Sequence, residues 1–305
     1  MEKIRIGRIT AKTRSNVLIQ GEEGCGKKLF GRAIHQTSPM AAKPFIHQNC
    51  AGISEKDLQT ELFGTNKPDR RPGSLEQANG GVLFLDEVAA MPLDLQRQLL
   101  AILQNGQFQR PGEKQVRPLE VRIIATTSRD LLQEIAFNGT FLSDLYDHLN
   151  VFNLQLPALR ERPEDIPLLA SSYLKKININ NQTNKQLSTE ALTALCSHSW
   201  PGNVRELINV LERAFYLSLD ETTIQLSHLP TTLSQGLGRQ QPKPQPHESN
   251  FAPENCSEQQ ELEHAIRASN YNMSKAAKRL GISRSTLYRK IGKYNIKLTA
   301  GIVKS

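Results

Sequence analysis

A glycine-rich segment, Gly21-Glu-Glu-Gly-Cys-Gly-Lys-Lys28, limits the fold more than any other part of this chain. It follows an apolar run with strand character, Val17–Gln20, and precedes residues 27–35, which have helical spacing. Backbone N–H groups of a glycine loop at a helix N-terminus surround phosphate groups, and the lysine reaches the β and γ oxygens. An ordinary tight turn is the alternative. The residues predicted to hold the phosphates are Gly21, Glu22, Glu23, Gly24, Cys25, Gly26, Lys27 and Lys28.

A second motif begins about 60 residues after the first. Gly80-Gly-Val-Leu-Phe-Leu-Asp86-Glu87 is an apolar strand that ends in two carboxylates. An Asp at this place holds Mg²⁺ through water, and the adjacent Glu polarises an attacking water molecule. An acidic cap on a following helix is the alternative, and Lys28 stands where a Ser or Thr would bind Mg²⁺. The two motifs together predict a nucleotide site with ATP and Mg²⁺ as ligands, Asp86 as the metal residue and Glu87 as the catalytic one.

Short β-rich runs alternate with helical ones from Val17 to about Ile166. The runs 17–19, 44–46, 82–85 and 121–125 are predicted strands, and residues 93–103 have helical spacing. This alternation predicts an α/β fold with a mostly parallel sheet covered by helices.

The rest of the chain divides by composition. Residues 167–230 show helical patterns only, residues 231–256 are rich in Gln, Pro, Gly and Ser, and residues 257–305 are helical again. A segment rich in polar residues and Pro cannot bury a core and reads as a linker. We therefore expect an α/β domain over 1–166, a helical lid over 167–230, a linker over 231–256 and a DNA-binding domain over 257–305.

The formal charge of +8 is concentrated near one end. After Glu263 the chain has ten Lys or Arg residues and no Asp or Glu, whereas the rest holds 28 basic and 30 acidic residues. A local excess of this kind is typical of a segment that binds a polyanion, with a merely solubilising tail as the alternative.

The same basic segment has the pattern of a helix-turn-helix. One amphipathic helix over 258–268 and a second over 274–280 are followed by Gly281, which ends the second helix, and by a third helix capped by Ser283. The last helix of this plan enters the major groove of double-stranded DNA, so Leu287 and Ile291 face inward. The predicted DNA-binding residues are Arg284, Ser285, Thr286, Tyr288, Arg289, Lys290 and Lys293.

Other classes of protein are disfavoured. No apolar run approaches the roughly 18 residues of a membrane helix, and the first residues lack a secretory signal. Four well-separated cysteines give neither a zinc spacing nor a disulfide framework, so we expect a cytoplasmic protein.

The chain resembles the AAA+ domain of sigma-54-dependent transcriptional activators, the bacterial enhancer-binding proteins, with a Fis-type helix-turn-helix. The segments that carry the resemblance are 21–28, 49–51, 61–64, 80–87, 121–131, 156–162, 164–166, 200–207 and 272–290. The resemblance implies an AAA+ sheet domain with a helical lid. It also implies phosphate binding by Lys27, Mg²⁺ at Asp86 and water activation by Glu87. Arg205 would be the sensor arginine at the γ-phosphate, and Ser128 stands where members carry a sensor asparagine.

Two departures from the family are informative. Members follow Glu61-Leu-Phe-Gly64 with a Gly-Ala-Phe-Thr-Gly-Ala loop that engages sigma-54, whereas this chain runs through a short polar segment to Gly73. The two inter-subunit arginines correspond to Leu142 and His148; the histidine is also compatible with a plain surface residue. Loss of arginine fingers worth about 10³–10⁵ in rate predicts weak or lost ATP hydrolysis.

We therefore expect a DNA-binding transcriptional regulator with an ATP-binding core that acts without sigma-54, nearest to regulators of the dihydroxyacetone-operon type. The alternatives are a functional sigma-54 activator ATPase and a truncated, inactive remnant of one. Members of the family carry residues before the position of Met1 that help form the adenine pocket. Two explanations therefore remain for this chain: a truncated reading frame, or a short variant with a reshaped pocket. RNA polymerase is a candidate partner, whereas contact with sigma-54 is not expected. We expect the protein to form a homodimer or a higher homo-oligomer.

Overall fold

The computed structural model describes residues 7, 10–65, 72–110, 113, 115–218, 221–234, 262, 265, 266, 269, 273–282 and 287. Its contacts divide the chain into two compact units, Met1–Gln241 and Pro242–Ser305. Among the described residues, no helix is both long and apolar enough to cross a membrane.

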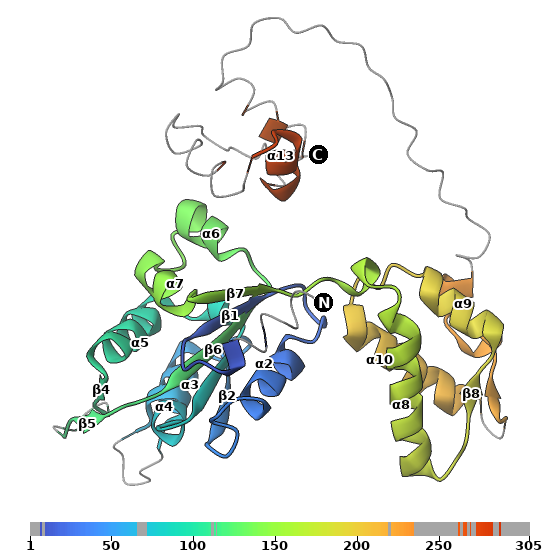
Figure 1. Cartoon of the computed structure of the whole chain (residues 1–305), viewed down its shortest axis with the longest axis horizontal. Coiled ribbons are helices and arrows are strands. Elements are labelled where there is room, and N and C mark those ends of the chain that lie inside the picture. The colour runs from blue at the N-terminus through green and yellow to red at the C-terminus, as the bar shows by residue number, and fades with distance from the viewer. Residues whose placement is uncertain are drawn as a thin grey trace, which may run out of the picture. The chain divides into compact units, whose positions relative to one another are not determined.

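Five parallel strands form the main sheet of the first unit, in the order β2-β3-β6-β1-β7 (Figure 1). The strands are β1 (Val17–Gln20), β2 (Phe45–Asn49), β3 (Val82–Asp86), β6 (Arg122–Thr127) and β7 (Phe152–Gln155). This confirms the predicted α/β fold with a parallel sheet. The strand β7 was not predicted, because it is a partly exposed edge strand with a weak apolar pattern.

Helices cover both faces of this sheet. They are α2 (Lys27–Gln36), α3 (Glu55–Phe63), α4 (Ser74–Gln77), α5 (Leu93–Asn105), α6 (Leu131–Gln133) and α7 (Ser143–Leu149), with the single turns η1 (Val88–Ala90) and η2 (Glu134–Asn138). A two-stranded antiparallel pair, β4 (Gln107–Phe108) and β5 (Arg117–Pro118), follows α5.

Alternate residues of each strand face opposite layers, as the period of two requires. Leu83 and Leu85 of β3 belong to the cluster formed with α3, α5 and α7, whereas Val82 and Phe84 belong to the cluster on the α2 side. A Cβ atom at Gly31 of α2 would lie 2.4 Å from the Phe84 ring. The glycine therefore lets α2 pack closely on the sheet and hold its N-terminus at the sheet edge.

The lid forms a separate hydrophobic cluster around Trp200, which is fully buried and donates its indole N–H to the Leu195 carbonyl at 2.9 Å. Its elements are η3 (Leu159–Glu161), α8 (Asp165–Asn181), α9 (Thr189–Ser197), α10 (Asn203–Leu217), η4 (Leu226–His228) and α11 (Thr231–Ser234).

Two details of the lid differ from the sequence expectation. A parallel pair, β8 (Gln186–Leu187) and β9 (Thr223–Ile224), joins its helices, although only helical patterns were expected there. Strands of two residues have no periodicity to detect. In addition, Leu233 of α11 is buried in the lid cluster, inside the stretch expected to be a linker.

The second unit is described for a few residues only. Leu262, Ile266, Ala276, Ala277 and Leu287 form its buried cluster, as the helical pattern predicted. Helix α13 spans Met273–Arg279, and Gly281 beyond it has a φ of 66°, the left-handed conformation expected at a helix end.

Leu99→Ala tests the packing of α5 on the sheet. Leu99 is fully buried, so its truncation is expected to lower the free energy of unfolding by about 2–5 kcal/mol. Urea unfolding followed by circular dichroism measures the change. The matched variant Leu29→Ala, at a side chain that is 77% exposed, is expected to stay within about 0.5 kcal/mol of the parent. Equal losses in both variants would contradict this account of the core.

Candidate nucleotide site

Several of the predicted nucleotide-site residues meet at one edge of the sheet because all five strands are parallel and their carboxyl ends lie together. The glycine loop follows β1, Asn49 ends β2, and Asp86 ends β3. A cavity of about 310 Å³ lies there, lined by Glu23, Gly24, Lys27, Lys28, Asn49, Ala51, Asp86, Glu87 and Arg205.

The glycine loop has a backbone that other residues would strain. Gly24 and Gly26 have φ values of 74° and 106°, both left-handed. A Cβ atom at Gly24 would also lie 2.4 Å from the carbonyl oxygen of Gly202 in the lid. The loop is therefore shaped by its glycines and packed closely against the lid, with α2 beginning directly after it.

Lys27 is buried and holds the loop from inside. Its Nζ donates to the carbonyl oxygens of Gly21 at 2.8 Å and Glu22 at 3.2 Å, and lies 3.0 Å from Glu87 Oε1. The other carboxylate oxygen of Glu87 accepts from both the backbone N–H and the hydroxyl of Ser128, each at 2.8 Å. Ser128, predicted to touch a nucleotide, thus contacts Glu87 and is not among the residues that line the cavity.

Each carboxylate oxygen of Asp86 also has one side-chain partner. Thr126 Oγ1 donates to Asp86 Oδ1 at 2.5 Å, and His47 Nε2 lies 3.4 Å from Asp86 Oδ2. The same threonine hydroxyl accepts from the Glu87 backbone N–H at 3.2 Å, where Glu87 has a left-handed φ of 52°. Thr126 and His47 therefore orient the Asp86 carboxylate, and the Thr126 hydroxyl also holds the Glu87 backbone.

The lid contributes the third cation of the cavity. Arg205 lies on the first turns of α10, and its Nη1 is 3.6 Å from Glu23 Oε2. Both side chains are more than two-thirds exposed, so water weakens this pair and it exchanges readily with another anion.

Glu22 joins the loop to the lid instead of lining the cavity. Both of its oxygens accept from Arg160, at 2.8 and 2.5 Å, and Asn203 Nδ2 donates to it at 3.1 Å. The hydrogen bonds from Arg160 lower the pKa of Glu22 to about 2; partial burial opposes this shift and the bond from Asn203 adds to it.

The two thiols near the site are not nucleophiles at neutral pH. Burial, followed by the charges of Asp86 and Glu87, raises the pKa of Cys50 to about 12. Burial also raises the pKa of Cys25. Both groups stay protonated, so their contribution here is packing.

Sequence reasoning missed several residues of the site. Asn49 and Ala51 line the cavity, and Asn203 binds the loop from the lid. The segments 49–51 and 200–207 resemble the family and contain these residues, but the resemblance did not show which side chains line the cavity or bind the loop. The predicted DNA-binding residues, 284–286, 288–290 and 293, lie outside the described residues.

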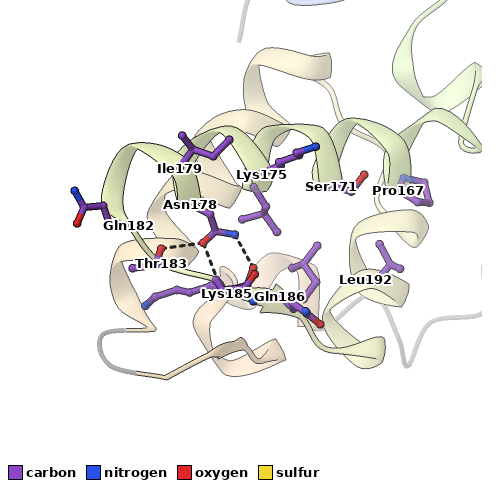
Figure 2. Close-up of a pocket in the computed structure, with 13 residues that line it drawn as sticks. Pro167, Ser171, Lys175, Asn178, Ile179, Gln182, Thr183, Lys185, Gln186 and Leu192 are labelled. Atoms are coloured by element: carbon purple, nitrogen blue, oxygen red, sulfur yellow. Dashed lines mark hydrogen bonds between the residues drawn. The ribbon is translucent and has the colours of Figure 1, made fainter.

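A second cavity, of about 500 Å³, lies in the lid between α8 and the segment after it. Figure 2 shows Asn178 bonded to Thr183 and Lys185, with Ile179 and Leu192 among the lining side chains. No Asp, Glu, His or Cys lines this cavity. It therefore offers no carboxylate, imidazole or thiol, and its lining shares no residue with the predicted phosphate site.

Three family descriptions match successive parts of the chain. Residues 1–155 match the Sigma-54 interaction domain, residues 160–246 the AAA+ ATPase lid domain, and residues 257–294 the Bacterial regulatory protein, Fis family.

Known proteins match nearly the whole chain. A Geobacillus stearothermophilus protein named limonene hydroxylase is 41% identical over 98% of this chain and 55% of its own length. The DNA-binding transcriptional activator HyfR of Escherichia coli strain K12 is 41% identical over 94% of this chain and 45% of its own length. This chain thus spans about half the length of these relatives.

Among solved structures, NtrX from Brucella abortus in complex with ATP is 34% identical and has a TM-score of 0.71. The match covers 97% of this chain and 67% of that one. This chain therefore shares its AAA+ fold with a helical lid with NtrX.

Glu22→Gln tests the link between loop and lid. A lowered carboxyl pKa stabilises the fold above the unfolded value, near 4.5, and the stabilisation is lost as pH falls toward 2. At pH 7 we expect the variant to be about 1 kcal/mol less stable, since both partners are partly exposed.

Urea unfolding of parent and variant at a series of pH values measures this difference, which should shrink between pH 4.5 and 2. Glu120→Gln, which breaks an exposed pair with Arg14, serves as the control and should cost less than about 0.5 kcal/mol. A difference for Glu22→Gln that is unchanged at low pH would show that the ionised pair is not its source.

Proposed function

The chain belongs to the family of AAA+ proteins with a sigma-54 interaction domain, and on that premise we propose that it is a sequence-specific DNA-binding transcriptional regulator that acts without sigma-54. In this proposal residues 1–166 bind nucleotide, 167–230 form the lid, 231–256 link the parts and 257–305 bind DNA. Within the family, the proposed nearest relatives are regulators of the dihydroxyacetone-operon type.

The proposal that the protein acts without sigma-54 is supported by one observation, the short connection between α3 and α4. A Cβ atom at Gly73, just before α4, would lie 2.4 Å from the backbone N of Gly64, just after α3. The two ends of the connection are therefore in contact, with eight residues between them. The family resemblance expects the sigma-54-binding loop at this place, and so short a polar segment leaves no room for it.

DNA binding is supported by the Fis-family match and by the charge of the same segment. The ten basic residues and absence of acidic ones after Glu263 suit the phosphate backbone of double-stranded DNA. Arg284, Arg289 and their neighbours on the last predicted helix are proposed to read the site. A homodimer on a palindromic sequence, with RNA polymerase as a candidate partner, completes the proposal.

Nucleotide binding is supported by the cavity beside the glycine loop and by the ATP complex of NtrX. Lys27, Lys28 and Arg205 would offset the phosphate charge. Turnover is proposed to be weak, because the positions of the family's inter-subunit arginines hold Leu142, which packs on the core, and the half-buried His148.

Mg²⁺, which the family implies, fits these residues poorly. All four carboxylate oxygens of Asp86 and Glu87 already have protein partners. No group of three or more His, Cys, Asp or Glu side chains in the described part of the chain is arranged to hold a metal ion. Magnesium takes oxygen ligands in near-octahedral geometry, so an ion bound directly by these carboxylates would have to share oxygens that already have protein partners.

A reporter assay tests independence from sigma-54. Genome-wide footprinting of the protein first locates its sites, and a promoter with one such site is then fused to a reporter. In cells lacking sigma-54 we expect regulation by the protein to persist, because the segment that would contact sigma-54 is missing. A variant lacking residues 257–305 is the control and should lose regulation. Complete loss of regulation by the full chain in those cells would overturn the proposal.

Lys27→Ala tests the nucleotide site. Removing a charged donor to the phosphates is expected to weaken ATP binding about tenfold or more, measured by titration calorimetry. Lys176→Ala, at an exposed lysine of α8 outside the cavity, is the matched control and should bind as the parent does. Unchanged binding in Lys27→Ala would contradict the assignment of the site.

A further inference from the structure

We infer that this site binds the phosphates of a nucleotide without a divalent cation, and that the Lys28 ammonium takes over the charge compensation that a metal ion supplies elsewhere. The inference rests on the proposed nucleotide binding and specifies the form of the ligand: a metal-free di- or triphosphate.

The first step is the state of the carboxylates. Asp86 accepts from Thr126 and contacts His47, and Glu87 bridges Lys27 and Ser128. A metal ion ligated directly by either carboxylate would share its oxygens with these partners. Glu87 Oε1 lies 3.0 Å from the buried Lys27 ammonium, so this carboxylate already has a cationic partner within the protein.

The second step is the balance of charge in the cavity. Three carboxylates (Glu23, Asp86 and Glu87) and three cations (Lys27, Lys28 and Arg205) line it. Lys27 is paired with Glu87, and Arg205 lies near Glu23. Lys28 is the remaining cation: within the described residues it makes no hydrogen bond and no ion pair. An unpaired ammonium beside the glycine loop attracts phosphate and repels a divalent cation.

The third step is the position of Lys28 in the chain. It is the second residue of α2, directly after the loop lysine, on a first turn without acidic residues. In phosphate loops of the G-x-x-x-x-G-K-[ST] pattern, the residue at this position supplies a hydroxyl ligand to Mg²⁺. Here the same position presents a positive charge on a long, exposed side chain. Lys28 therefore lines the cavity at the position where that pattern has its hydroxyl ligand, and we expect its ammonium to contact the phosphates from there.

Titration calorimetry of the full chain with ATP, in excess EDTA and separately in excess MgCl₂, tests the inference. The parent should bind ATP in EDTA at least as tightly as in MgCl₂. Lys28→Ser, which replaces the ammonium by a hydroxyl, should lose about tenfold or more in EDTA and much less in MgCl₂. The matched control, Lys176→Ser, removes an exposed charge from the lid and should behave as the parent does.

Two results would overturn the inference: tenfold tighter binding by the parent in MgCl₂ than in EDTA, or unchanged binding by Lys28→Ser in EDTA. If the parent binds ATP in neither condition, the proposed nucleotide site itself fails, which is a different result from binding that needs Mg²⁺.

A second measurement does not depend on any variant. Electron paramagnetic resonance of Mn²⁺, which replaces Mg²⁺ in nucleotide complexes, reports how much of the ion is bound. Parent protein with ATP should retain no more Mn²⁺ than ATP alone does. Extra Mn²⁺ held by the protein–ATP mixture would show a metal site and contradict the inference.

Discussion

The site of this protein depends on the buried side chain of Asn203, which joins three parts of the chain. Its Oδ1 accepts from the Leu159 backbone N–H at 2.8 Å, and its Nδ2 donates to the Glu23 carbonyl at 2.9 Å and to Glu22. The phosphate loop, the junction after the sheet and the first turn of α10 therefore meet at one amide. Because Arg205 is two residues further on, these bonds also set where the lid presents its arginine.

Most of the charged side chains at the carboxyl edge of the sheet are paired with one another. Each carboxylate that the motifs would offer to a metal ion or to water is bonded to a neighbouring side chain, and the Lys27–Glu87 pair is largely buried. A ligand of strong negative charge is the kind that can compete for Lys27, since breaking a buried pair requires an equally good partner. A site of this type therefore suits a strongly anionic ligand.

Much of the fold could be read from local patterns. Apolar runs such as Val82–Asp86 and the helical spacing over 93–103 predicted elements that the structure confirms. Patterns failed where pairing is decided by distant neighbours. The strand β7 and the two-residue strands β8 and β9 form because other strands offer them hydrogen bonds, not because their own residues alternate.

The candidate site shows the same division. The residue types and spacing of the two motifs placed Lys27, Asp86 and Glu87 at one sheet edge, since parallel strands bring their carboxyl ends together. Contacts across the chain could not be inferred in this way. That Ser128 binds Glu87, that Thr126 and His47 engage Asp86, and that Glu22 binds Arg160 depend on side-chain directions and distances set by packing.

By itself, the sequence determined the α/β class, the phosphate loop, the basic segment and the short connection after Gly64, because glycine conformations, charge and chain length are local properties. Only the tertiary structure decided which charges of the cavity are paired with one another, because pairing requires groups from separate segments to lie within hydrogen-bond distance.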